Sequence, residues 1–193
     1  LHTTNALPEV KQELDGYKIS PNTKVCMNVA RITKEKNHLM LVQVFNDLID
    51  EGNDVILLMF GYTKGNPTLT KQIENSIKYP DRIKLMGTRT NIPDYLHEAD
   101  YFCMPSLWEG LPISMLEAGM SGVYPIATPV GGIPDVLKDE CWGLLAKDTS
   151  KEAFKRQVEK GLKMNIDRRQ LATLYDSNYS MRNCAKRYLE IYK

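Results

Sequence analysis

Short apolar runs and segments of helical periodicity alternate about six times along the sequence, and this alternation restricts the fold more than any other feature. The run at 55–60, VILLMF, has no polar residue, as in a strand that is buried on both faces of a parallel sheet. The segment before it, 38–51, carries apolar residues at helical spacing, and Gly52 is placed to end a helix. Repeated strand–helix pairs of this kind predict an α/β fold.

The expected architecture is an open parallel sheet of about six strands with helices on both faces. Strands are predicted over 25–29, 55–60, 82–86, 101–104, 124–127 and 143–146, and helices over 38–51, 68–78, 92–98, 112–120 and 134–138. The remainder, 151–192, predicts two or three helices without a strand. In such Rossmann-like folds, right-handed crossovers place the functional loops at the carboxyl ends of the strands, where ligands bind.

The bulk composition excludes several classes of protein. Twenty-five Lys and Arg residues balance 24 Asp and Glu residues, so we expect no nucleic-acid partner and no strongly charged field. The longest apolar run, 55–60, is far below the about 20 residues that span a bilayer. The four cysteines show no C-x-x-C pattern, so neither a metal site nor a disulfide is expected, and the compartment predicted is the cytoplasm.

The densest group of chemically informative residues is the segment 105–118, PSLWEGLPISMLEA. A strand is predicted to end just before it, and Pro112 is well placed as the first residue of a helix. The amides of Gly110, Leu111 and Ile113 would then point out of the helix start without an internal partner. Such a helix start, with its partial positive charge, suits a phosphate group.

Two carboxylates flank this helix start. Glu109 precedes it and Glu117 lies in its second turn. A carboxylate accepts two hydrogen bonds at once, so each glutamate is able to grip the vicinal diol of a sugar or a ribose. The alternative is ordinary complementation of the helix dipole, which is the more common reason for a glutamate at such a position.

A basic loop, 28–37 (NVARITKEKN), follows the first predicted strand and therefore lies at the same edge of the sheet. Arg31 and Lys36 are candidates to meet a diphosphate there, Arg31 as a fork and Lys36 as a point charge. A solvated basic loop is the alternative. The sequence contains neither a Walker-type phosphate loop nor G-x-G-x-x-G, which argues against kinases, NTPases and dehydrogenases.

Three motifs in this order resemble the C-terminal domain of retaining glycosyltransferases with the GT-B architecture, specifically glycosyltransferase family four. Residues 30–36 resemble the family's G-R-L-x-x-x-K segment, with Ala30 and Ile32 in place of glycine and leucine. Residues 109–117 match the family's two glutamates separated by seven residues. Residues 127–136 are similar to its strand and glycine turn. The resemblance covers the chain from about Thr23 to the end.

The resemblance implies roles for the charged residues. Arg31 and Lys36 would bind the donor's diphosphate and stabilise the departing nucleoside diphosphate. Glu109 would contact hydroxyls of the transferred sugar, which makes these three the implied catalytic residues. Glu117 would hold the ribose diol. Neither a metal nor a cofactor is expected.

The donor pocket would be completed by Gly110, Leu111, Pro112 and Ile113, and by the turn that contains Thr88 and Arg89; both sets of residues follow from the resemblance. The first set would shape the phosphate and sugar pocket through the backbone. The turn would lie near the base.

The implied activity is transfer of a hexose from a nucleoside diphosphate sugar to a saccharide or lipid-linked acceptor with retained configuration. Because the family has two domains, residues 1–22 are expected to be a lead-in from an upstream domain and residues 23–193 the nucleotide-sugar-binding domain with C-terminal helices. The chain alone would then be inactive, and the intact enzyme would contact the inner membrane face at most peripherally. Alternatives are a sugar-nucleotide epimerase, a phosphorylase, a non-catalytic nucleotide-binding module and, less favoured, a flavodoxin-like regulatory domain.

Overall fold

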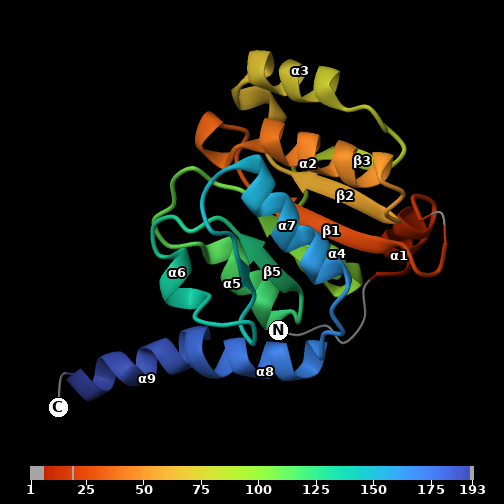
Figure 1. Ribbon diagram of the computed structural model, residues 1–193. Coiled ribbons are helices and arrows are strands. Elements are labelled where there is room, and N and C mark those ends of the chain that lie inside the picture. The colour runs from red at the N-terminus through yellow and green to blue at the C-terminus, as the bar shows by residue number, and fades with distance from the viewer. Residues whose placement is uncertain (1–6, 19, 192–193) are drawn as a thin grey trace.

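The computed structural model describes residues 7–18 and 20–191. Within these residues, six parallel strands form one sheet of order β3-β2-β1-β4-β5-β6 (Figure 1). The strands are β1 (Lys24–Val29), β2 (Val55–Phe60), β3 (Ile83–Gly87), β4 (Tyr101–Met104), β5 (Tyr124–Ala127) and β6 (Leu144–Leu145). The predicted α/β fold with a Rossmann-like parallel sheet is confirmed.

Helices connect the strands and follow the last one. They are α1 (Pro8–Asp15), α2 (His38–Asp50), α3 (Pro67–Ser76), α4 (Ile92–Glu98), α5 (Ile113–Met120), α6 (Ile133–Val136), α7 (Lys151–Leu162), α8 (Arg168–Tyr179) and α9 (Met181–Ile191). Two short 3-10 turns, η1 (Lys34–Lys36) and η2 (Thr63–Gly65), lie in the loops after β1 and β2. Most predicted helices differ from these bounds by only a few residues, because each carries a clear apolar stripe.

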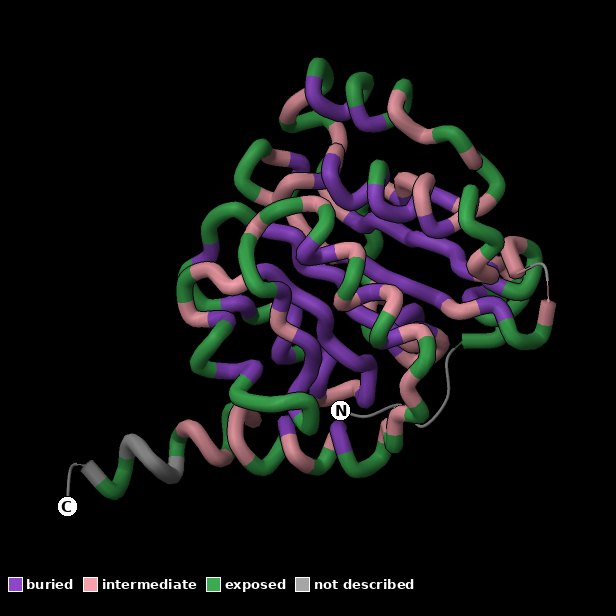
Figure 2. Tube along the Cα trace, in the orientation of Figure 1, coloured by how far each residue is buried: buried purple, intermediate pink, exposed green. Residues whose placement is uncertain are grey.

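The order of the strands fixes where a ligand can bind. The chain runs outward from β1 through β2 to β3, and then returns to place β4 on the other side of β1. The four central strands, β2, β1, β4 and β5, are buried along almost their whole length (Figure 2), as the all-apolar sequence of β2 predicts. In open parallel sheets, ligands bind at such a reversal of the strand order, here at the carboxyl ends of β1 and β4.

Helix packing holds the elements around this crevice. Helices α2 and α7 lie side by side over one face (Figure 1), and Lys151 Nζ lies 2.9 Å from a carboxylate oxygen of Asp47 between them. Helix α5 packs on α8, where Gly119 lies against the ring of the fully buried Tyr175. A Cβ atom at Gly119 would lie 2.4 Å from that ring, so glycine is required for this contact.

Residues 8–15 form a helix that the sequence analysis did not assign. Val10 and Leu14 of α1 are buried in the main core, and α1 contacts α4. The hydroxyl of Tyr95 on α4 donates to Glu13 Oε2 at 2.6 Å. This part of the expected lead-in therefore packs onto the sheet domain, while residues 1–6 lie outside the described residues.

The difference at the start of α5 bears on the site. Pro112 was expected to be the first residue of a helix, but α5 begins at Ile113. Pro112 has φ −81° and ψ 67°, and the Ile113 amide donates to the Leu111 carbonyl at 2.9 Å. These values define an inverse γ-turn centred on the proline, whose ring already fixes φ near this angle. The expected free amide of Ile113 is therefore used within the turn.

Candidate functional site

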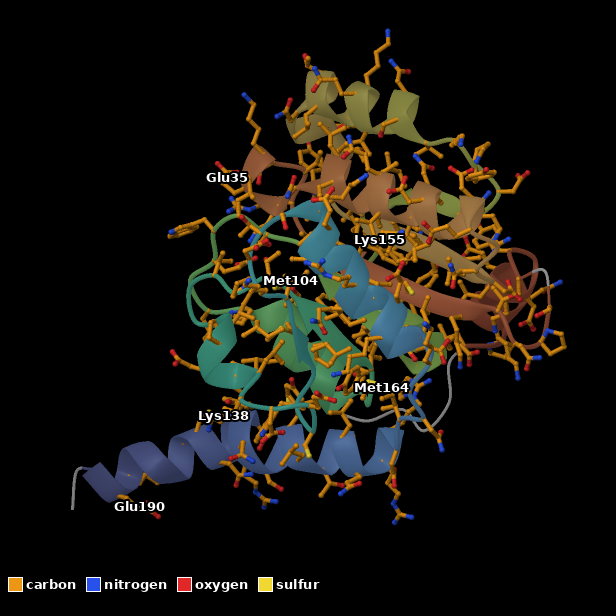
Figure 3. All side chains as sticks on the ribbon, in the orientation of Figure 1. Glu35, Met104, Lys138, Lys155, Met164 and Glu190 are labelled. Carbon is orange, nitrogen blue, oxygen red and sulfur yellow. The ribbon has the colours of Figure 1, made fainter. Side chains whose placement is uncertain are left out.

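The loops after β1 and β4 meet at the carboxyl edge of the sheet, because the two strands are neighbours there. The amide of Leu107, in the loop after β4, donates to the carbonyl of Glu35, in the loop after β1, at 2.7 Å. One residue further along, Lys36 Nζ lies 2.5 Å from Glu109 Oε1. In Figure 3, Glu35 and Met104 mark the two elements that form this edge.

Glu109 is a largely buried carboxylate that is held on one side only. Its side chain is 7% exposed, and that of Lys36 is 18% exposed. The hydroxyl of Ser106 donates to the same oxygen, Oε1, at 2.8 Å. Its second oxygen, Oε2, has no hydrogen bond to any described residue. The carboxylate therefore has one satisfied oxygen and one that remains available to a ligand.

The predicted glycine turn supports the backbone of Glu109. Gly131 has φ +55°, and a Cβ atom added there would lie 1.8 Å from the carbonyl oxygen of Glu109. The amide of Gly132 donates to the Gly110 carbonyl at 3.1 Å. The turn thus packs directly against the loop that carries the glutamate, and glycine is needed for both its conformation and this contact.

Two buried hydroxyls below the loop escaped the sequence analysis. Thr128 is fully buried; its Oγ1 donates to the Ser106 carbonyl at 2.5 Å, and its amide donates to the Met104 carbonyl at 3.1 Å. Ser106 in turn contacts Glu109. The sequence signal available was the spacing of three residues between Ser106 and Glu109, inside a motif that had already been identified.

The residues around the ion pair enclose a cavity of about 220 Å³. Its lining contains most of the residues predicted from the two motifs: Val29, Ala30, Arg31, Lys36, Met104, Glu109, Leu111, Pro112, Ile113 and Ser114. The amides of Leu111 and Ser114 donate no hydrogen bond within the described part of the chain, and neither does that of Gly110. The cavity therefore combines cationic side chains with unused amides near the start of α5, a combination that suits an anion.

A second hollow of about 220 Å³ adjoins the first and shares Val29, Ala30 and Arg31 with it. Its other lining residues come from the end of β2 and from the segments that follow β2 and β3: Phe60, Gly61, Tyr62, Thr88, Arg89 and Ile92. Arg31 is exposed and lines both spaces. Thr88 and Arg89 thus lie beside the motif residues but not among them.

The structure does not bring Glu117 into either hollow. It is exposed on α5, one turn beyond Ile113 and therefore on the same side of the helix. Gly110 also lines neither space, although its carbonyl is bound by Gly132. Of the ten predicted site residues, these two are the ones that line neither hollow.

His38, at the start of α2, is buried close to this site. Neither ring nitrogen has a hydrogen-bond partner among the described residues. Burial, with a smaller contribution from the charge of Lys36, lowers the pKa of His38 from 6.5 to about 4. The neutral imidazole therefore persists well below neutral pH and adds no charge beside Lys36.

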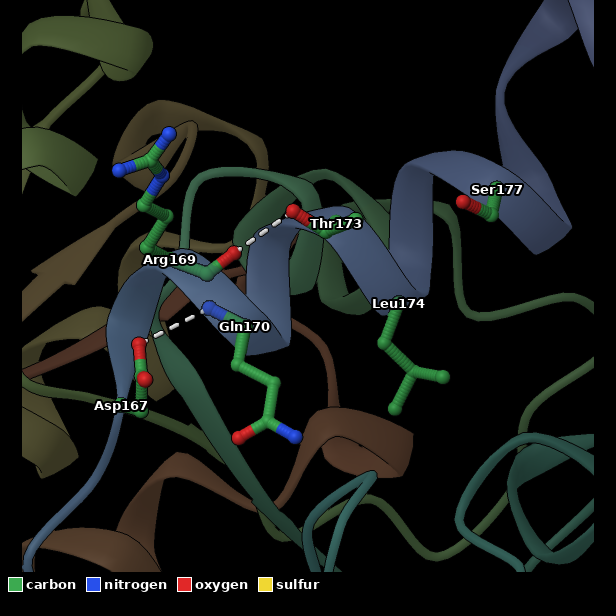
Figure 4. Close-up of a pocket in the computed structure, with 6 residues that line it drawn as sticks. All are labelled: Asp167, Arg169, Gln170, Thr173, Leu174 and Ser177. Carbon is green, nitrogen blue, oxygen red and sulfur yellow. Dashed lines mark hydrogen bonds between the residues drawn. The ribbon is translucent and has the colours of Figure 1, made fainter.

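A larger hollow lies elsewhere and shows no comparable chemistry. It measures about 540 Å³ and lies along α8 (Figure 4). The Asp167 carboxylate there caps the helix by accepting from the Gln170 amide, and the Thr173 hydroxyl donates to the Arg169 carbonyl. These polar groups make hydrogen bonds within the helix and its N-cap. The volume of a hollow therefore does not identify the functional site.

The described residues offer neither a metal-binding cluster nor a membrane-spanning helix. No group of three or more His, Cys, Asp and Glu side chains is arranged to hold a metal ion. No helix in the same part of the chain is long and apolar enough to cross a bilayer.

Known proteins resemble this chain throughout the sheet domain. The family model described as glycosyl transferases group 1 matches residues 10–173. A UDP-Gal:alpha-D-GlcNAc-diphosphoundecaprenol alpha-1,3-galactosyltransferase from Escherichia coli is 28% identical over 148 residues, covering 76% of this chain and 38% of the relative. An N-acetyl-alpha-D-glucosaminyl L-malate synthase from Bacillus anthracis is 27% identical over 175 residues, covering 88% and 45%. The chain thus spans less than half the length of these curated relatives.

Solved structures share the fold. A glycosyltransferase from Rickettsia africae superimposes with a TM-score of 0.86 at 22% identity, covering 98% of this chain and 52% of the other. HepE from Anabaena, solved in complex with UDP and glucose, gives a TM-score of 0.78 at 17% identity, covering 97% and 53%.

Proposed function

The chain belongs to the group 1 family of glycosyl transferases, and from this premise we propose that it is the donor-binding half of a glycosyltransferase. The donor is a nucleoside diphosphate sugar bound at the carboxyl ends of β1 and β4. The enzyme transfers its hexose to a saccharide or lipid-linked acceptor with retained anomeric configuration. The printed name of the Escherichia coli relative, with a nucleotide sugar and a diphosphoundecaprenol acceptor, supports this class of substrates.

The observation that carries the proposal is the meeting of Lys36 and Glu109 in one cavity with Arg31. Negative charge develops on the diphosphate as the glycosidic bond breaks. Fixed cations and unused amides bind the leaving diphosphate more strongly than the intact donor, and this difference accelerates the reaction. We propose that Arg31 and Lys36 supply those cations, with the amides of Leu111 and Ser114 beside them, so that no metal is needed.

The remaining contacts follow from the positions of the side chains. The free Oε2 of Glu109 accepts hydrogen bonds from hydroxyls of the transferred sugar. Glu117, on the same side of α5 as Ile113, holds the ribose diol at the open end of the cavity. The base occupies the second hollow, where Thr88 and Arg89 offer backbone and side-chain polar groups.

We propose that a second domain supplies the acceptor site. Several large apolar side chains are exposed beside the cavity; Trp108 is the most exposed at 68%, and the others are Leu107, Leu111 and Ile113. Exposed apolar groups gathered around a site are typical of surfaces that another protein surface covers. The relatives, which are more than twice as long as the matched region, have room for such a domain.

The proposal is tested with the full-length enzyme and UDP-, GDP- and ADP-hexoses. Release of the nucleoside diphosphate with acceptor present measures transfer, and NMR of the product reports its anomeric configuration. Transfer with retention supports the proposal. Hydrolysis only, epimerised donor, or turnover that requires inorganic phosphate would replace it with one of the rival activities.

A further inference from the structure

The contacts of Glu109 have a consequence for how the donor is recognised. Lys36 Nζ and Ser106 Oγ both contact Oε1, at 2.5 and 2.8 Å, and nothing in the described part of the chain contacts Oε2. The ammonium of Lys36 makes no other hydrogen bond there. Without a ligand, the cation proposed to bind phosphate is therefore neutralised by the carboxylate proposed to bind sugar.

A diphosphate and this carboxylate cannot both hold Lys36 without mutual repulsion. The pair is poorly screened, because the two side chains are only 18% and 7% exposed. A nucleoside diphosphate that contacts the ammonium in the cavity lies close to the like charge of Glu109, and this repulsion favours separation of the ammonium from the carboxylate. A donor that still carries its sugar offers hydroxyls, which donate to the released carboxylate and offset that cost.

We propose that the donor's diphosphate and Glu109 compete for Lys36, so that the sugar is recognised only after the diphosphate has displaced the carboxylate. Ser106 is a positioning residue: its hydroxyl continues to donate to Oε1 when Lys36 leaves and leaves Oε2 free to accept from the sugar. The inference rests on the proposed donor site. Its functional consequence is that the sugar-free product binds less tightly than the donor, which favours product release.

The test compares the affinities of the chain and of Glu109→Gln for UDP, GDP and ADP, each with and without its hexose, by calorimetry. Glutamine keeps the shape and the acceptor for Ser106 but removes the charge that competes for Lys36. For whichever nucleotide binds, we expect affinity for the sugar-free diphosphate to rise about tenfold, since a like charge beside it is lost. Affinity for the hexose conjugate should rise much less or fall.

The control removes the carboxylate charge of a more exposed ion pair that lies away from the cavity. Lys155 Nζ lies 2.5 Å from Glu51 Oε1, at the opposite end of α2 from His38. Glu51→Gln should change neither affinity by more than about twofold, as is usual for a remote surface substitution. Thermal unfolding of each variant without ligand verifies that it is folded.

Ser106→Ala provides a second readout. Without the Ser106 hydroxyl, Lys36 is the only remaining contact of the Glu109 carboxylate among the described residues. The hexose conjugate should then bind no more tightly than the sugar-free diphosphate. If Glu109→Gln binds the sugar-free diphosphate no better than the unsubstituted chain does, the competition is excluded and the donor site stands. If the unsubstituted chain binds no nucleoside diphosphate, the donor site and the competition both fail.

Discussion

Lys36 and Glu109 are separated by 73 residues of sequence, yet Lys36 Nζ lies 2.5 Å from Glu109 Oε1. The contact exists because β1 and β4 are neighbours although they are not consecutive strands. The reversal of the strand order brings together the basic loop 28–37 and the segment 105–118, each of which has an ordinary structural explanation when taken separately. Their meeting in one cavity turns a basic loop and a helix-start glutamate into a candidate site.

Lys36→Ala should weaken nucleoside diphosphate binding about tenfold to a hundredfold, because a hydrogen bond to a charged group contributes about 1.5–3 kcal/mol. Lys34→Ala is the matched control, since Lys34 is exposed on the same loop and does not line the cavity. Calorimetric titration of both variants measures the difference. Equal affinities in the two variants would remove Lys36 from the site.

Glu117→Ala should distinguish the contribution of the ribose to affinity from that of the phosphates. If Glu117 holds the ribose diol, the variant loses affinity for nucleoside diphosphates by about tenfold or more and retains affinity for inorganic pyrophosphate, which has no ribose. Lys36→Ala should lose affinity for both ligands. A Glu117 variant with unchanged nucleotide affinity would contradict the assignment.

Gly131→Ala should destabilise the domain by about 3 kcal/mol or more, from left-handed strain together with overpacking. An added Cβ atom would lie 1.8 Å from the Glu109 carbonyl oxygen, so the loop must shift. Gly52→Ala isolates the strain, because Gly52 has φ +85° and nothing lies within 4 Å of the added atom. We expect it to cost only about 1–2 kcal/mol. Urea unfolding measures both, and equal losses would refute the close contact.

Acid should destabilise the protein through His38. Above pH 6.5 the imidazole is neutral in both the folded and the unfolded chain. Below pH 6.5 the imidazole of the unfolded chain binds a proton, whereas that of the folded chain stays neutral until about pH 4. The stability that the neutral histidine contributes is therefore lost as pH falls through this window, by about 3 kcal/mol in total. His38→Leu should lose less stability than the unsubstituted chain between pH 6.5 and 4. The control, His97→Gln, should lose as much stability as the unsubstituted chain. Parallel losses in all three proteins would argue against a buried neutral His38.

The sequence predicts the strands well where burial leaves no alternative. The range of β2 is matched to the residue because VILLMF suits only a strand covered on both faces, and the ranges of β4, β5 and α4 are matched too. The start of α5 was misplaced because proline at a helix start and proline in an inverse γ-turn share nearly the same φ. The sequence does not distinguish them without the ψ angle, which depends on the packing of the loop.

The site was predicted only in part, for a related reason. The charge of Arg31, Lys36 and Glu109 within their motifs indicates ligand binding, so these residues were identified as candidates. Ser106 and Thr128 act through buried hydroxyls, and a serine or threonine in sequence carries no sign of what it will contact. The helix at 8–15 was missed because its two buried residues, Val10 and Leu14, form too short an apolar stripe to stand out from its polar neighbours.

Thermal unfolding of this chain with UDP, GDP, ADP and NAD at matched concentrations tests the donor site most directly. At about 100 times its dissociation constant, a ligand adds about 2.7 kcal/mol, which raises the midpoint of a domain of this size by about 5–10 °C. We predict that at least one nucleoside diphosphate gives such a shift, that NAD does not, and that Lys36→Ala keeps at most about half of it. No shift with any nucleoside diphosphate, or an equal shift in the Lys36 variant, would contradict a donor site built on Lys36 and Glu109.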